Sequence, residues 1–125
     1  MLERFKLLRE GLHGVHALRK VPFFRDRVSP LLDQEVFWRL EGIPFPVRLR
    51  LVRHVSWVLS MAVEPDLIAA FLGVQKVFQT KVFWDVGANF GYFSWLLLGK
   101  NPDLKVVIFE PEPDNASLMR KTIEK

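Results

Sequence analysis

The chain has 125 residues, half of them hydrophobic and 13% aromatic, which suits one folded domain and excludes a disordered chain. It has no cysteine, so disulfides, thiolate metal sites and a cysteine nucleophile are excluded. No apolar run approaches the ~20 residues of a membrane-spanning helix, and the charged N-terminus lacks the apolar core of a secretory signal. We therefore expect a cytoplasmic protein.

The net charge of +4 belongs to the N-terminal segment. Residues 1–29 carry seven lysines and arginines against three acidic residues, while the rest of the chain is balanced. Residues 2–19 place apolar side chains at helical spacing, and the proline-containing stretch after them predicts irregular chain with a short helix over 31–40. We interpret 1–46 as a basic, partly helical extension. Its charge is too sparse for nucleic-acid binding, and either a solvated helix face or weak contact with a membrane surface fits it.

Residues 47–80 predict a strand pair and a helix. Residues 47–51 alternate strictly between apolar and basic side chains, which predicts a half-buried strand. Apolar residues at every second position over 55–61 suggest a second strand, and a single helix over 48–62 is the competing interpretation. Glu64-Pro65-Asp66 then predicts a helix start, because proline and acidic residues favour the first turn, and this helix would run to about Val77.

Residues 81–125 predict a strand–turn–helix–strand–helix unit. Two short apolar runs end in acidic residues, Asp85 and Glu110, and a glycine-containing turn with a mostly apolar helix over 92–98 separates them. A final helix is expected over 115–124 with Asp114 as its cap. This order indicates an α/β fold with a parallel strand pair, and ligands of such sheets bind beyond the carboxyl ends of the strands.

The glycine turn indicates which nucleotide ligand is favoured. A dinucleotide fingerprint needs G-x-G-x-x-G, but counted from Gly87 the other two glycine positions hold Asn89 and Tyr92. No phosphate-binding P-loop is present either. Asp85 would repel a pyrophosphate and suits a cationic adenosyl ligand such as S-adenosylmethionine. Glu110, at the end of the next strand, is placed to accept hydrogen bonds from a ribose diol.

Two sequence blocks resemble the FkbM family of class I S-adenosylmethionine-dependent methyltransferases. The first is Asp85-Val86-Gly87-Ala88-Asn89-Phe90-Gly91-Tyr92-Phe93, which is similar to the family's D-V-G-A-N-x-G-Y-[FY] block. The second is Phe109-Glu110-Pro111-Glu112-Pro113-Asp114-Asn115, which is similar to F-E-P-x-P-x-N. Glu64-Pro65 resembles a third element, with Val63 in place of its aromatic residue. The resemblance covers 63–125 and implies a Rossmann-like methyltransferase fold, of which 81–125 holds the first βαβα portion.

The resemblance also implies a cofactor site for S-adenosylmethionine. The backbone of Gly87, Ala88 and Asn89 would lie against the methionine part, with Asp85 helping to hold that end and Gly91 opening the next helix beside it. For the remaining residues, it implies that Glu110 binds the ribose hydroxyls, that Pro111 shapes the wall next to the adenine, and that Glu64 reaches the methionine amino group.

The implied reaction is O-methylation of a hydroxyl on a sugar, glycan or secondary metabolite. A class I methyltransferase has seven strands, so the acceptor half would lie beyond residue 125, and no catalytic residue and no metal ligand is assigned. The missing strands would leave Val82, Trp84, Val106 and Ile108 without partners, which predicts an aggregation-prone chain or an oligomer that covers the open sheet edges. The alternatives are a non-catalytic remnant or interaction module and, disfavoured by the missing glycines, another nucleotide enzyme.

Overall fold

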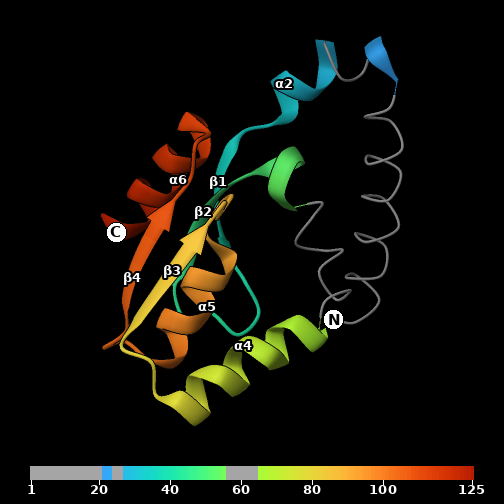
Figure 1. Cartoon of the computed structure of the whole chain (residues 1–125). Helices are drawn as coiled ribbons and strands as arrows, with labels where there is room; N and C mark the ends of the chain where they lie inside the picture. Colours follow the sequence, from blue (N-terminus) through green and yellow to red (C-terminus); the bar gives the residue numbers. More distant parts are fainter. Residues whose placement is uncertain (1–20, 24–26, 56–64) are drawn as a thin grey trace. The chain divides into compact units, whose positions relative to one another are not determined.

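A computed structural model describes residues 21–23, 27–55 and 65–125 (Figure 1). The chain divides into two compact units, residues 1–36 with 50–62 and residues 37–49 with 63–125. The helix predicted over 2–19 and the predicted cofactor residue Glu64 lie outside the described residues. In the described part of the chain, no helix has both the length and the apolar character to cross a membrane. The cytoplasmic location stays a prediction.

The first unit contains a short helix, α2 (Ser29–Leu32), followed by the start of strand β1 (Glu35–Arg39). The helix predicted over 31–40 is therefore wrong beyond Leu32. Val36, Phe37 and Trp38 are β-branched or aromatic residues, which favour an extended chain, and pairing with β2 completes that extended form.

Strand β2 (Pro46–Arg50) confirms the strand predicted from the alternation over 47–51. Val47 and Leu49 are fully buried, while the arginines between and after them are partly exposed. Among the described residues, β2 pairs with β1, the strand before it. Leu51–Val55 forms a π-helical turn, so the second strand predicted to start at Val55 is wrong at that residue, and 56–61 lie outside the described residues.

The second unit contains the predicted strand–helix–strand–helix order. It comprises β3 (Val82–Val86), α5 (Tyr92–Lys100), β4 (Lys105–Phe109) and α6 (Pro113–Ile123). β3 and β4 are parallel and run side by side in Figure 1, with Val82 opposite Lys105 and Val86 opposite Phe109. The described chain is thus a mixed α/β structure with two two-stranded sheets.

One face of the β3–β4 sheet is covered by helices. α4 (Pro65–Phe78), which confirms the helix predicted from Glu64-Pro65-Asp66, carries Phe71. The ring of Phe71 lies 5.7 Å from that of Phe83 on β3 and 4.6 Å from that of Phe93 on α5. These aromatic contacts join α4, α5 and the sheet, so the two helices lie on the Phe83 side of β3.

In the part of the chain that the structure describes, the opposite face of this sheet is exposed. Trp84 is 65% exposed and Val86 77% exposed, and Val82 and Phe109 on the same face are also exposed. The rings of Trp84 and Phe109 lie 5.6 Å apart, so they form one apolar patch. Val106 and Ile108, also expected to lose partners, are instead half-buried, because they are in register with Phe83 and Asp85 on the helix-covered face.

We expect the open face to cause concentration-dependent self-association, because contiguous exposed apolar surface favours contact between copies. Trp84→Thr should weaken it, as measured by sedimentation velocity over a concentration series, and should change unfolding stability by less than about 1 kcal/mol, because the indole is mostly exposed. Ile123→Thr, at an exposed residue near the end of α6, is the matched control. Equal association of the two variants and the unaltered chain would show that this face is inert.

Tyr92 is the only tyrosine in the chain, so its ionisation can be followed without ambiguity. Burial and, secondarily, the negative charge of Glu41 raise the pKa of its phenol above its usual value. A near-ultraviolet titration should show phenolate forming above pH ~10 in the folded chain and near ~10 in urea. Stability should therefore fall as the pH rises above ~10, since the unfolded state loses its proton first. Glu41→Gln should lower the folded midpoint, and an unchanged midpoint would contradict the assignment.

Candidate functional site

The loop between β3 and α5 is shaped by three left-handed residues. Gly87, Asn89 and Gly91 have φ angles of 74°, 57° and 82°. Glycine adopts such angles without strain, and asparagine tolerates them better than other residues. The N–H of Gly87 donates to the carbonyl of Phe109 at 2.8 Å, so the loop turns across the carboxyl end of β4. The loop after β3 is thus bonded to the end of β4, where the carboxyl ends of both parallel strands meet.

Glu110 fastens this loop to the end of β4. Its Oε2 accepts a hydrogen bond from the N–H of Asn89 at 2.6 Å, and its Oε1 accepts one from the N–H of Glu112 at 3.0 Å. Hydrogen bonds to a carboxylate are stronger than those between neutral groups. Each carboxylate oxygen keeps acceptor capacity after one such bond. Two residues that the sequence assigned to the cofactor, Asn89 and Glu110, are therefore in direct contact.

Asp85 lies within β3, one residue before its end, and is held from α5. The buried hydroxyl of Ser94 donates to Asp85 Oδ2 at 2.5 Å. Ser94 is a supporting residue that the sequence reasoning missed. Its only sequence signal is a hydroxyl within the first turn of an otherwise apolar helix. The contact fixes a negative carboxylate close to the carboxyl end of β3, next to the strand that ends before Glu110.

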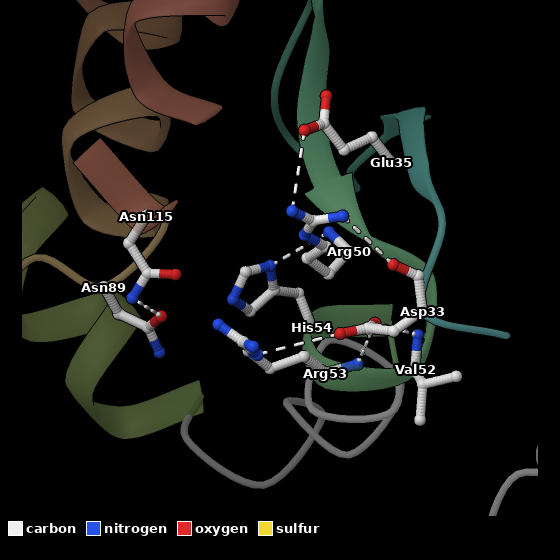
Figure 2. A network of polar contacts seen from close by, with 8 residues as sticks. All are labelled: Asp33, Glu35, Arg50, Val52, Arg53, His54, Asn89 and Asn115. Atoms are coloured by element: carbon white, nitrogen blue, oxygen red, sulfur yellow. Dashed lines mark hydrogen bonds and ion pairs between the residues drawn. The ribbon is translucent and has the colours of Figure 1, made fainter. Parts of the chain in front are cut away.

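A second missed residue, Asn115, supports the loop from α6. Its Nδ2 donates to Asn89 Oδ1 at 3.1 Å, as the close view in Figure 2 shows. Asn115 belongs to the F-E-P-x-P-x-N block, but nothing in the sequence assigned it a role. The predicted cap is also corrected here, because α6 already begins at Pro113, which places Asp114 inside the first turn instead of before it.

Gly91 is buried at the start of α5, where two helices meet. A Cβ atom there would lie 2.8 Å from Trp95 Nε1 and 3.0 Å from Met119 Sδ. The Trp95 indole cannot easily move away, because its Nε1–H donates to the carbonyl of Phe90 at 2.7 Å. At Gly87, in contrast, an added Cβ would meet nothing within 4 Å. Gly91 thus serves the packing of α5, and the open side of the loop is at Gly87.

The remaining predicted site residues occupy neighbouring positions. Ala88 is buried within the loop, and Pro111 is exposed directly after Glu110. Of the eight predicted cofactor residues, the structure therefore describes seven, all on the loop or at the ends of β3 and β4: Asp85, Gly87, Ala88, Asn89, Gly91, Glu110 and Pro111.

The donors and acceptors of this site suit a ligand that donates hydrogen bonds better than they suit a pyrophosphate. A phosphate cradle needs backbone N–H groups that point outward. Here the loop N–H groups donate within the protein, those of Gly87 and Ala88 to Phe109, that of Asn89 to Glu110 and that of Gly91 to Ala88. What the site offers a ligand is acceptors, the carboxylates of Asp85 and Glu110. Acceptors of this kind suit ribose hydroxyls and an ammonium group.

A separate polar network lies in the first unit, and its hydrogen bonds stabilise the π-helical turn Leu51–Val55. Asp33 Oδ1 accepts hydrogen bonds from the N–H groups of Val52 at 2.8 Å and Arg53 at 2.9 Å (Figure 2). The carboxylate thus satisfies two N–H donors near the start of the π-helical turn, in the way that an N-cap does, while the Leu51 N–H donates to the Gln34 carbonyl. The buried His54 accepts a hydrogen bond at Nδ1 from the N–H of Arg50 at 3.1 Å. These contacts hold the turn in place.

Comparisons with protein-family models, curated proteins and solved structures found no match for this chain. Among the described residues, no group of three or more histidine, aspartate and glutamate side chains could hold a metal ion.

Proposed function

We propose that this chain is the cofactor-binding portion of an S-adenosylmethionine-dependent methyltransferase of the FkbM type. The observation that carries the proposal is the hydrogen bond of 2.6 Å between the Asn89 N–H and Glu110 Oε2. It joins the glycine loop after one parallel strand to an acidic residue after the next. A ligand at the carboxyl ends of the two strands would meet the loop on one side and this carboxylate on the other.

The proposed roles follow from the chemistry of each group. Glu110 accepts hydrogen bonds from the two ribose hydroxyls, while its contacts with the Asn89 and Glu112 N–H groups keep it in place. Asp85, oriented by Ser94, supplies negative charge toward the methionine ammonium. The open side of Gly87 lets a ligand lie close to the backbone. Pro111 borders the adenine.

The bound cofactor would supply a methyl group on a sulfonium, which an acceptor oxygen displaces in line. The acceptor in this proposal is a hydroxyl of a small molecule, sugar or glycan. No catalytic base is assigned among the described residues, because Asp85 and Glu110 are committed to cofactor binding. What these residues contribute is position, the largest requirement of such a displacement.

The direct test is calorimetric titration of S-adenosylmethionine, S-adenosylhomocysteine and NAD into the purified chain. We expect micromolar binding of the two adenosyl ligands and no heat with NAD, because the loop N–H groups are turned inward. Tighter binding of NAD would contradict the proposal. No heat with any ligand, from a chain shown by circular dichroism to be folded, would favour the alternative of a non-catalytic remnant or interaction module.

A charge variant sharpens this test. Asp85→Asn keeps an acceptor for the Ser94 hydroxyl and removes the negative charge, and should weaken S-adenosylmethionine binding about 10-fold or more. The matched control is Asp103→Asn, which removes the same charge from an exposed loop before β4, at the opposite end of the strand from the site. Equal affinities of the two variants would argue that Asp85 does not face the ligand.

A further inference from the structure

Asn89 is the one non-glycine residue of the loop with a positive φ, and it is held at two points. Its backbone N–H donates to Glu110, and its side-chain Oδ1 accepts from Asn115 Nδ2 at 3.1 Å. A left-handed conformation costs asparagine less than most other residues, but more than glycine. The surrounding contacts must offset that cost, and Asn115 supplies one of the two.

Asn115 is suited to hold the loop because it is itself fixed. It is only 8% exposed, in the first turn of α6, and the same helix is anchored by the fully buried Leu118. Its partner Asn89 is exposed. The hydrogen bond therefore connects a rigid helix position with an exposed loop residue, 26 positions apart in the chain.

We propose that Asn115 is a positioning residue of the cofactor site, acting through Asn89 to keep the 87–91 loop in its binding shape. This inference rests on the proposed function. It adds a residue of α6 that touches no ligand and yet sets affinity. Without the Asn115 amide, Asn89 can leave the left-handed region, and the geometry that Glu110 and Gly87 present to the ribose and methionine parts is lost.

If Asn115 had a merely structural role, Asn115→Leu would lower global stability and would not act mainly on the loop. The Asn115 Oδ1 is buried without a hydrogen-bond partner among the described residues, so replacing the amide by an apolar group of similar size removes a poorly satisfied oxygen as well as a useful donor. Asn115→Leu should therefore change global stability little. Its effect should be concentrated in the order of the loop and in ligand affinity.

The experiment compares Asn115→Leu with Thr122→Val. Thr122 is a buried polar residue of the same helix, which accepts from the Arg48 N–H at 3.0 Å and donates to the Leu118 carbonyl. Hydrogen exchange of the loop amides is measured in the free chain, and S-adenosylmethionine affinity by calorimetry. Asn115→Leu should speed exchange at Asn89 and weaken binding, each about 5- to 10-fold, whereas Thr122→Val should leave both unchanged.

A double-mutant cycle shows whether Asn115 acts through Asn89. Asn89→Gly keeps a residue that accepts a positive φ and removes the side-chain acceptor. In that background Asn115→Leu should have no further effect on exchange or affinity. If Asn115→Leu does not fold, Asn89→Gly alone removes the same hydrogen bond from its exposed side, and it should speed loop exchange.

Loop exchange that Asn115→Leu alters no more than Thr122→Val does, or losses that add fully in the double variant, would overturn the inference. If the unaltered chain binds no S-adenosylmethionine, the proposed function fails. The exchange measurement on the free chain then still decides whether Asn115 positions the loop.

Discussion

Glu110→Ala is expected to weaken S-adenosylmethionine binding at least about 100-fold. Each hydrogen bond from a neutral group to a carboxylate contributes about 1.5–3 kcal/mol, and the proposed ribose contacts use two of them. The substitution also removes the acceptor of the Asn89 N–H, so Asn89, in the loop proposed to contact the methionine part, keeps only its hydrogen bond from Asn115. Calorimetric titration of the variant measures the loss directly.

Glu112→Ala is the matched control for this prediction. Glu112 is exposed, and the contact that the structure gives it with Glu110 is made by its backbone N–H, which alanine retains. The control removes the same charge two residues away and should bind nearly as well as the unaltered chain. If Glu110→Ala and Glu112→Ala bound equally well, the carboxylate of Glu110 would have no part in recognition.

Glu110→Gln separates shape from acceptor chemistry. Glutamine has the same size, but one of its terminal atoms is an NH₂ donor. In the folded loop both terminal positions face backbone N–H donors, those of Asn89 and Glu112. One of these contacts must then become a donor facing a donor, so we expect glutamine to restore only part of the affinity lost in Glu110→Ala.

The parallel strand pair could be predicted from the sequence because its signals are local. Each strand is a short apolar run ended by an acidic residue, and glycine or proline separates it from the next helix. The alternation in β2 was equally visible. β1 was not, because its apolar residues lie between charged ends within a proline-containing stretch that also fits irregular chain. Its extended form is completed by pairing with β2, which is a tertiary contact.

The residues of the candidate site also divide into those that local sequence signals predict and those that depend on tertiary contacts. The acids and glycines at the strand ends follow from the order of the elements, so the positions of Asp85, Gly87 and Glu110 could be predicted from the sequence. Ser94 and Asn115 could not, because their roles depend on hydrogen bonds to Asp85 and Asn89 that only the packing of α5 and α6 brings into range. For the same reason the sequence could not show that Gly91 is constrained by Trp95 and Met119.

Gly91→Ala is expected to destabilise the chain by about 2–4 kcal/mol, measured by urea unfolding. Two effects add. At a φ of 82° the new Cβ strains the backbone, and the same atom would lie 2.8 Å from an indole nitrogen that is already bonded to the Phe90 carbonyl. Relief requires Trp95 to shift, which would break that hydrogen bond and disturb its edge contact with Phe45, whose ring centroid is 6.2 Å away.

Two other glycines separate these effects. Gly87→Ala carries the backbone strain alone, since its φ is 74° and its Cβ would meet nothing within 4 Å, so a loss of about 1–2 kcal/mol is expected. Gly73→Ala carries neither, because Gly73 lies within α4 with open space around it, and it should stabilise the chain by about 0.5–1 kcal/mol. If Gly91→Ala lost no more stability than Gly87→Ala, the contact with Trp95 would relax at little cost and α5 would be less firmly seated than its buried start indicates. A larger loss in Gly91→Ala than in Gly87→Ala would show that helix packing fixes the C-terminal end of the loop at Gly91. Gly87 would then be the loop glycine with open space beside it for a ligand.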